Sequence, residues 1–197
     1  MNSKQRIAIF ASGNGSNAEE IIKYFRSNAT IEVALLLTNN PEATALERAS
    51  KFNIPTKVFS KAQFYESEEV ISWLNDFQVT HVVLAGFLWL IPKNLIHAFP
   101  GRIVNIHPAL LPKFGGKGMY GLKVHEAVKL SGEKETGITI HSINENYDEG
   151  EMLFQTSCAV NESDSPHDIA TRVNQLEYEH YPKVIEDWII KNPIVLK

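Results

Sequence analysis

Residues 102–112 read RIVNIHPALLP, a short β-branched apolar run that passes directly into a turn with two prolines. Open α/β sheets keep their sites at the carboxyl ends of their strands, so this stretch predicts a site near Asn105 and His107. Strand side chains alternate with period two, which places both side chains on one side of an extended chain. A histidine alone would indicate only a strand end. Beside an amide that donates and accepts hydrogen bonds, it favours acyl-type transfer.

The chain before this stretch alternates between short apolar runs and helical patterns. Ser16 and Glu19 have the spacing of a capping box and predict that a helix starts there. The alternation predicts a parallel sheet covered by helices. The expected strands are 6–11, 31–37, 56–59, 81–85 and 102–106, and the expected helices are 18–25, 41–51, 63–77 and 92–98.

The pattern changes after residue 112. A glycine-rich loop, 115–121, is followed by an expected helix, 122–130, and by strands 137–143 and 152–160, whose short connection predicts antiparallel pairing. A long helix, 166–190, is expected next, with a possible interruption at Pro182. The fold class is therefore α/β, a Rossmann-like, mostly parallel twisted sheet of about seven strands with helices on both faces. We expect a single domain over residues 1–197.

Composition narrows the class of protein. Hydrophobic residues make up 44% and charged residues 21%, as in ordinary soluble globular proteins, and the net charge of −4 does not suggest a nucleic acid partner. The longest apolar run, 82–91, is too short to span a membrane, and residues 7–11 are interpreted as a strand rather than a signal peptide. Cys158 is the single cysteine, which agrees with a cytoplasmic location and no internal disulfide.

The first turn, residues 13–18 (GNGSNA), fits the pattern G-x-G-x-x-G/A. Glycines in such loops let the backbone approach an anion, and the following helix supplies free N–H groups. A dinucleotide site also needs an acidic residue after the second strand, where this chain has Thr38-Asn39-Asn40. The loop therefore favours a single phosphate over NAD or FAD, and a purely structural turn is the alternative.

Residues 144–150 (NENYDEG) form an acidic connection between the two late strands. By itself this segment would be interpreted as a solvated loop. We hypothesise that it folds back over the turn after residue 106, where Asp148 would raise the pKa of His107. The resulting imidazolium would donate a proton and stabilise negative charge near pH 7.

Other chemistries find little support. The seven histidines include no pair spaced two to four residues apart, and neither H-E-x-x-H nor C-x-x-C occurs, so no metal site is expected. His125, His141 and His180 are interpreted as structural or surface residues. Glu177, taken alone, is interpreted as a residue on a solvated helix face.

Four motifs now stand in order: 12–17 (SGNGSN), 84–87 (LAGF), 105–112 (NIHPALLP) and 147–150 (YDEG). Together they closely resemble the phosphoribosylglycinamide formyltransferases, folate-dependent enzymes of purine synthesis, from about residue 7 to residue 190. The NIHPALLP segment by itself marks the wider formyltransferase superfamily. Methionyl-tRNA formyltransferases carry an extra C-terminal domain and formyltetrahydrofolate deformylases usually an N-terminal regulatory domain, and neither is expected here.

The resemblance implies a reaction. The amine of glycinamide ribonucleotide would attack the formyl carbon of 10-formyltetrahydrofolate. His107, as imidazolium, and the Asn105 amide would stabilise the tetrahedral oxyanion. Asp148 would keep His107 charged, and the proton for the departing folate nitrogen would pass through His107 or a held water.

The resemblance also implies binding residues. Ribotide binding falls to Gly15, Ser16, Asn17, Gly86, Asn174, Gln175 and Glu177. Folate binding falls to Leu88, Trp89, Leu90, Ile91, Asn105, Asn144, Glu145, Asn146, Tyr147 and Asp148. The half at about 1–100 would hold the ribotide phosphate, and the half at about 101–197 would carry catalysis and folate binding.

Two positions depart from the family pattern. Trp89 stands where members usually carry arginine, and Glu66 and Ser67 stand near an expected basic residue that contacts the folate tail. Both departures leave open how the glutamate tail of the folate is held. The loop 114–121 is richer in glycine than usual, and we hypothesise that it is mobile and orders on ligand binding. Equally slow hydrogen exchange in this loop with and without ligands would contradict that.

These observations predict two small-molecule substrates, with 10-formyltetrahydrofolate as co-substrate and no metal. No nucleic acid or membrane partner is expected, and the chain would act in the cytoplasm as a monomer or weak homodimer. Two alternatives stay open. One is a deformylase that releases formate from 10-formyltetrahydrofolate without a ribotide. The other is a catalytically inert phosphate- or nucleotide-binding module.

Overall fold

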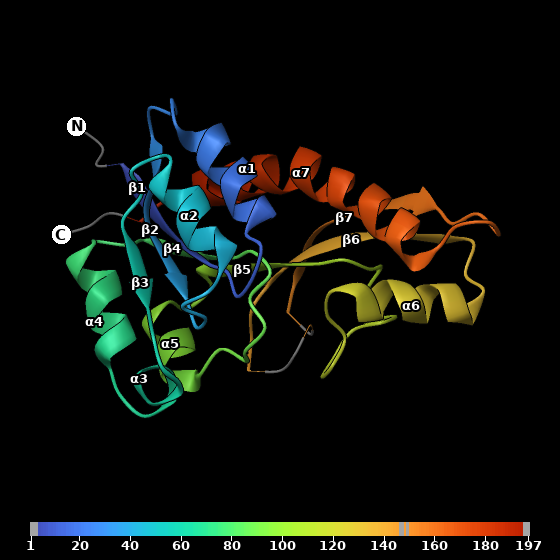
Figure 1. The fold of residues 1–197 in the computed structure, drawn as a ribbon. Helices are drawn as coiled ribbons and strands as arrows, with labels where there is room; N and C mark the ends of the chain where they lie inside the picture. Colours follow the sequence, from blue (N-terminus) through green and yellow to red (C-terminus); the bar gives the residue numbers. More distant parts are fainter. Residues whose placement is uncertain (1–3, 146–147, 149, 195–197) are drawn as a thin grey trace.

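Seven strands form a single sheet in the computed structural model, which describes residues 4–145, 148 and 150–194 (Figure 1). The strands are β1 (Gln5–Phe10), β2 (Ile31–Thr38), β3 (Thr56–Val58), β4 (His81–Leu84), β5 (Ile103–His107), β6 (Glu135–Ser142) and β7 (Met152–Ala159). They pair in the order β3-β2-β1-β4-β5-β6-β7. The pairs among β1–β5 are parallel, whereas β5–β6 and β6–β7 are antiparallel, which confirms the predicted fold class.

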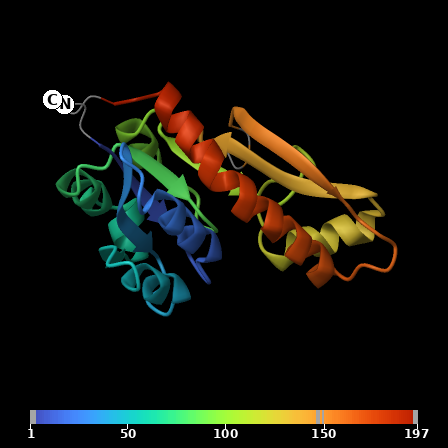
Figure 2. The ribbon, with the colours of Figure 1, turned by 90° about the horizontal axis from the view of Figure 1, so that it is seen from above.

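Helices cover both faces of this sheet. They are α1 (Ser16–Phe25), α2 (Thr44–Ser50), α3 (Lys61–Tyr65), α4 (Glu69–Asp76), α5 (Lys93–Ala98), α6 (Leu122–Ser131) and α7 (Pro166–Lys191). Figure 2 shows α7, in red, running from the end near the β6–β7 hairpin to the β1–β4 region, with α1 beside it. Helices α3, α4 and α5 pack on the opposite face.

Alternation along the strands divides the core into two layers. Ile7 and Ile9 of β1 pack in the layer that contains α1, α2 and α7. Ala8 and Phe10 pack in the layer that contains α3, α4 and α5. All four side chains are fully buried, as expected of a central strand that is covered on both faces. The rigid strand ends produced by this packing position the loops described below.

The prediction of one continuous helix over residues 63–77 is wrong, because the chain forms two helices there, α3 and α4. The Ser67 hydroxyl donates to the Gln63 carbonyl at 3.0 Å and accepts the Glu69 N–H at 3.3 Å. Such side-chain bonds compete with the helical backbone pattern. A capping box between Ser60 and Gln63 starts α3, and the sequence prediction missed it.

Two other helix starts differ from expectation. α1 begins at Ser16 as predicted, but its N-cap is Gly15 and no side chain caps it, so the predicted capping box is wrong. The Glu19 carboxylate pairs with Arg48 and Lys23 instead. α2 begins at Thr44 rather than at residue 41, because the chain turns first at residues 41–42.

Pro182 does not interrupt α7, which runs without a break from Pro166 to Lys191. Tyr181 and Pro182 are both buried against the sheet. The Tyr181 hydroxyl donates to the carbonyls of Leu84 at 2.9 Å and Val104 at 3.3 Å. This anchoring holds the helix in place although proline removes one backbone hydrogen bond.

Helices of membrane-spanning length and hydropathy do not occur in the described parts of the chain.

Candidate active site

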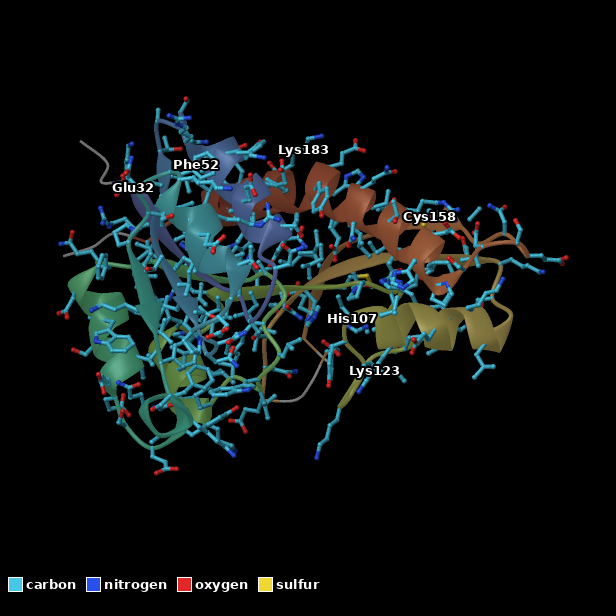
Figure 3. The ribbon with its side chains drawn as sticks, viewed as in Figure 1. Glu32, Phe52, His107, Lys123, Cys158 and Lys183 are labelled. Carbon is cyan, nitrogen blue, oxygen red and sulfur yellow. The ribbon has the colours of Figure 1, made fainter. Side chains whose placement is uncertain are left out.

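A crevice of about 510 Å³ opens at the carboxyl ends of β1, β4 and β5. The chain leaves β1 toward β2 and leaves β4 toward β5, so the strand order reverses between β1 and β4, where doubly wound sheets bind their ligands. Figure 3 labels His107 below α7, near the start of α6. The crevice brings together the predicted residues Ser16, Asn17, Gly86, Leu88, Trp89, Leu90, Ile91, Asn105, His107, Asp148, Asn174 and Glu177.

Ser12 joins the loops at the base of the crevice. Its hydroxyl donates to Asn39 Oδ1 at 2.7 Å and accepts the Leu88 N–H at 3.0 Å. Its own N–H donates to the Gly86 carbonyl at 3.1 Å. The loops that follow β1, β2 and β4 are therefore fixed relative to one another before any ligand binds.

Gly15 turns the chain from the first loop into α1. Its φ of 72° lies in the left-handed region that favours glycine. A Cβ on Gly15 would lie 2.5 Å from the Ala45 Cβ, which leaves no room for any side chain. Ser16 and Asn17 line the crevice directly after this turn, so the uncapped amino end of α1 faces the cavity. Free N–H groups in that position favour an anion.

Gly15→Ala is expected to destabilise the fold, because the new methyl group meets Ala45 and the backbone is strained. Overpacking typically costs about 1–3 kcal/mol and the positive φ adds to it. Urea unfolding gives the free energy directly. Gly13→Ala is the matched control, because open space surrounds its Cβ and its change should stay within about 0.5 kcal/mol. Equal stability of the two variants would contradict this account.

Glu177 of α7 is the buried acid of the crevice and is only 6% exposed, so its interpretation as a solvated residue is wrong. Its Oε2 accepts a hydrogen bond from Asn17 Nδ2 at 2.8 Å. Burial raises the pKa of Glu177 to about 7, against the opposing effect of Asn17. A carboxyl group with a pKa near 7 can accept hydrogen bonds from ligand hydroxyls when it is ionised, and can donate one to them when it is protonated.

Glu177→Gln is expected to stabilise the chain increasingly as the pH rises from 4.5 toward 7. Over this range the unfolded chain releases the Glu177 proton while the folded chain retains it, so wild-type stability falls. The shift corresponds to a relative gain of about 3 kcal/mol for the glutamine variant. Urea unfolding at the two ends of the range measures it. Glu179→Gln, an exposed change on the same helix, should show no such trend.

Asn105 and His107 leave β5 on the same side, as the strand period predicts, and both line the crevice. His107 is 4% exposed. Its Nε2 lies 2.8 Å from the Phe114 carbonyl, which can only accept, so Nε2 carries hydrogen. Nδ1 is therefore the nitrogen that gains or loses a proton.

Asp148 folds back over β5, as hypothesised from the sequence. Its Oδ2 lies 3.7 Å from His107 Nδ1 and accepts the Gly116 N–H at 2.9 Å. Its Oδ1 lies 3.5 Å from His141 Nε2. One carboxylate thus faces two imidazoles and also holds the loop that contains Gly116.

His141 belongs to this group, which sequence reasoning missed. It lies on β6 directly opposite Asn105 of β5, and Asn105 Nδ2 lies 3.2 Å from His141 Nε2. His141 Nδ1 lies 2.9 Å from the Ser142 carbonyl. Antiparallel pairing was predicted for β6 with β7 but not for β5 with β6. Only the register of the β5–β6 pair brings His141 beside Asn105.

The charge state of His107 differs from the prediction. Burial lowers the pKa of His107 below its ordinary value, although Asp148 and the Phe114 carbonyl act to raise it. The predicted net increase is wrong, because desolvation outweighs the carboxylate. Burial acts to raise the pKa of Asp148, but the hydrogen bond with His141, the charge of His107 and the Gly116 N–H together lower it.

His125 of α6 also lines the crevice and is 4% exposed. Its Nδ1 has no hydrogen-bond partner among the described residues. Burial, and then the charge of nearby His107, lowers its pKa to about 4, so it is neutral in the physiological range. His125 is buried, as its interpretation as a structural residue allows, but its position in the crevice near His107 was not predicted.

Trp89 adds an aromatic side chain to the lining of the crevice. Trp89 stacks on Tyr65 with ring centroids 5.8 Å apart and meets Phe64 at 5.9 Å. The Tyr65 hydroxyl donates to the Leu90 carbonyl at 3.0 Å. Trp89, supported by these contacts, gives a flat aromatic ligand an apolar surface in the crevice that His107 also lines.

Several predicted residues lie elsewhere. Gln175 is exposed on α7 and does not line the crevice. Glu145 pairs with Lys93 at 2.6 Å on the surface, which lowers its pKa, and it does not line the crevice. Gly15 and Asn144 border the crevice in sequence but do not line it. Asn146 and Tyr147 lie outside the described residues.

Metal ligands are not gathered anywhere in the described part of the chain. No group of three or more histidine, cysteine, aspartate or glutamate side chains is placed to hold a metal ion there. Each carboxylate oxygen of Asp148 faces one imidazole nitrogen, Oδ2 at 3.7 Å from His107 Nδ1 and Oδ1 at 3.5 Å from His141 Nε2. This arrangement suits proton exchange.

Comparisons with known proteins identify a matching family. The sequence pattern of one family, described as formyl transferase, matches residues 5–185. The chain is 43% identical over 188 residues to the chloroplastic phosphoribosylglycinamide formyltransferase of Arabidopsis thaliana, covering 92% of this chain and 64% of that protein. It is 36% identical to phosphoribosylglycinamide formyltransferase of Bacillus subtilis, covering 92% of this chain and 93% of that protein.

Solved structures show the same similarity. The crystal structure of phosphoribosylglycinamide formyltransferase from Bacillus halodurans superposes with a TM-score of 0.85 at 37% identity, covering 95% of this chain and 96% of that one. The chain spans 64% and 60% of the length of the two plant relatives, from Arabidopsis thaliana and Vigna unguiculata.

Proposed function

The chain belongs to the formyl transferase family, and from this premise we propose that it transfers the formyl group of 10-formyltetrahydrofolate to the amine of glycinamide ribonucleotide. One observation carries the proposal. Asn105, His107 and Asp148 line the same crevice as Ser16 and Asn17 at the amino end of α1 and as Trp89. A single crevice thus offers an anion site, a proton-transfer group and a flat apolar surface.

The ribotide would occupy the end of the crevice near α1. Its phosphate would accept from the uncapped N–H groups at Ser16 and Asn17. The ribose hydroxyls would reach Glu177, and Gly86 and Asn174 line the space between. Asn17 would contact the phosphate through its backbone N–H, and its side chain donates a hydrogen bond to Glu177. The phosphate contact and the ribose contact are therefore coupled through Asn17.

The formyl donor would occupy the end near Trp89. Its pterin ring would pack against Leu88, Leu90 and Ile91, which all line the crevice. Trp89, which stacks on Tyr65, stands where the resemblance implies an arginine in most members of the family. We propose that stacking, rather than a charge, supports this part of the donor.

The chemistry conserves protons overall. The ribotide nitrogen bonds to the formyl carbon, the bond from that carbon to N10 of the folate breaks, and one proton passes from the amine to N10. His107 Nδ1 would carry this proton, because burial lowers the pKa of His107 and so favours the form that can accept it. The Asn105 amide would donate to the oxyanion of the tetrahedral intermediate.

Asp148 would then balance the imidazolium that forms. Its Oδ2 lies 3.7 Å from His107 Nδ1, near enough to stabilise a positive charge in a buried site. The developing oxyanion raises the pKa of His107 in the same way. His141 would position Asp148 through its contact at 3.5 Å.

Isotope transfer tests the proposal. The chain is incubated with 10-formyltetrahydrofolate labelled with ¹³C in the formyl group, together with glycinamide ribonucleotide, and the products are identified by mass spectrometry. Label in the ribotide supports the transferase. Label only in free formate supports the deformylase alternative, and label left on the folate supports the inert binding module.

The remaining parts of the proposal concern the setting of the enzyme. We propose one domain over residues 1–197, whose first half mainly holds the ribotide phosphate while the second half supplies the catalytic residues. The chain would work in the cytoplasm as a monomer or weak homodimer. Both substrates are small molecules, and no metal takes part.

A further inference from the structure

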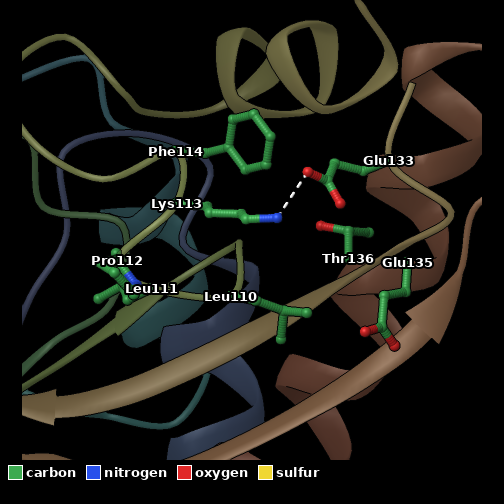
Figure 4. Close-up of a pocket in the computed structure, with 8 residues that line it drawn as sticks. All are labelled: Leu110, Leu111, Pro112, Lys113, Phe114, Glu133, Glu135 and Thr136. Atoms are coloured by element: carbon green, nitrogen blue, oxygen red, sulfur yellow. Dashed lines mark hydrogen bonds and ion pairs between the residues drawn. The ribbon is translucent and has the colours of Figure 1, made fainter. Parts of the chain in front are cut away.

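A second cavity, of about 260 Å³, lies beside the loop that follows β5 (Figure 4). It is lined by residues 110–114 on one side and by Glu133, Glu135 and Thr136 on the other. None of these residues lines the crevice described above. The cavity is therefore separate from the proposed substrate sites.

Thr136 supplies an unused polar group in this cavity. Its side chain is on β6 and is 2% exposed, yet its Oγ1 has no hydrogen-bond partner among the described residues. Figure 4 shows the hydroxyl directed toward the Glu133 carboxylate and the space beside it. Buried hydroxyls are almost always hydrogen-bonded, so an unpaired one beside a cavity can take a partner from a water molecule or a ligand that enters.

Charge in the cavity favours a cation. Lys113 Nζ pairs with Glu133 Oε1 at 2.8 Å, and the other carboxylate oxygen of Glu133 has no partner among the described residues. Glu135 adds a second carboxylate to the lining, so the three charged residues sum to one negative charge. The lysine is 64% exposed, so its pairing with Glu133 is weak and open to competition.

The remaining wall is apolar and small. Leu110, Leu111, Pro112 and Phe114 line it. A volume of about 260 Å³ lies just below the usual range of roughly 300–1,000 Å³ for drug-sized ligands, which excludes a folate or a nucleotide. One ring or a short branched chain fits the space.

We propose that this cavity binds a small primary amine that is attached to a single apolar group. The ammonium donates to the free oxygen of Glu133 and to Thr136 Oγ1, which satisfies the unpaired hydroxyl. The apolar group packs on Leu110, Leu111 and Phe114.

Phe114 links this cavity to the catalytic group. Its side chain lines the cavity, while its carbonyl accepts the hydrogen bond from His107 Nε2 at 2.8 Å. Its φ of 57° is rare for a residue with a side chain, so its conformation depends on the surrounding contacts. An occupant would restrain Phe114 and thereby the orientation of His107. Any effect on turnover rests on the proposed function, whereas binding of the amine does not.

Binding is tested first, without folate or ribotide, so that it can fail independently of the enzyme activity. The ¹⁵N-labelled chain is titrated with 2-phenylethylamine and, as the uncharged control, with 2-phenylethanol. We expect the amine to shift the amide signals of Leu111, Lys113 and Thr136 and to bind about tenfold more tightly than the alcohol. Equal affinities, or shifts confined to other parts of the chain, would overturn the proposal.

Variants of one ion pair sharpen the test, because its two members should act in opposite directions. Lys113→Met frees the Glu133 carboxylate and should tighten amine binding, whereas Glu133→Gln should weaken it about tenfold. Lys183→Met and Glu179→Gln, from an exposed pair on α7, are the matched controls and should change nothing. A purely structural role would move both members in one direction, and that result would overturn the proposal.

Thr136→Val tests the hydroxyl separately. Exchanging a buried, unpaired hydroxyl for a methyl group of the same shape should raise the melting temperature of the free protein. The same change should weaken the binding of 2-phenylethylamine, because one acceptor is lost. A lower melting temperature with unchanged affinity would contradict the assigned role of Thr136.

Discussion

His107→Ala is expected to lower kcat for formyl transfer by about 10²–10⁴-fold, because it removes the group that carries the proton and stabilises the oxyanion. The Michaelis constants for both substrates should change much less, since their proposed contacts lie mainly in other parts of the crevice. Steady-state kinetics measured through the folate absorbance gives both quantities.

Folding provides the necessary control for this prediction. His107 is buried, and its Nε2 bonds to the Phe114 carbonyl, so the circular dichroism spectrum and the melting temperature must be recorded for the variant. His167→Ala, at an exposed position, is the matched change and should leave turnover at the wild-type level. Near wild-type turnover in His107→Ala would remove the proposed mechanism.

Asp148→Asn is expected to give the second largest loss, about 10²-fold or more in kcat, because the buried imidazolium would lose its balancing charge. The negative charge of Asp148 acts to raise the pKa of His107, so its removal lowers that pKa further. The limb of the pH–rate profile that reports His107 should therefore move to lower pH.

The direction of that limb assigns the role of His107. A limb that rises with pH indicates a neutral imidazole that accepts the amine proton, and a limb that falls indicates an imidazolium that donates. Asp76→Asn, on the exposed end of α4, is the control and should leave the profile unchanged. A His107 limb at the same pH in wild type and Asp148→Asn would contradict the electrostatic coupling.

Local patterns were sufficient to predict most of the sheet. Apolar runs between turn residues identified the strands, and the eight-residue connection predicted the antiparallel pair of β6 and β7. Helix boundaries were less predictable, because hydroxyls decide them. The Ser67 hydroxyl bonds at the end of α3 and at the start of α4, and the spacing of hydrophobic residues does not reveal these bonds. Pro182 shows the converse, since buried contacts of Tyr181 hold α7 through a residue that normally interrupts helices.

The residues of the candidate site also fall into those that local sequence patterns predict and those that they do not. Asn105 and His107 were predictable from strand alternation. Asp148 was placed beside His107 by the hypothesis that the acidic connection folds back, and the resemblance to a family then implied its role. The positions of His141 and His125 depend on strand register and helix docking, which no local pattern contains. The net charge state of His107 was mispredicted, because the sequence shows the carboxylate but not the burial that outweighs it.

If one crevice binds both proposed substrates, formyl transfer requires the ribotide. The most direct test follows the folate absorbance with a deaza analogue of 10-formyltetrahydrofolate, with and without glycinamide ribonucleotide. The account predicts a spectral change only when the ribotide is present. An equal change without the ribotide, or no change with both substrates, would contradict it.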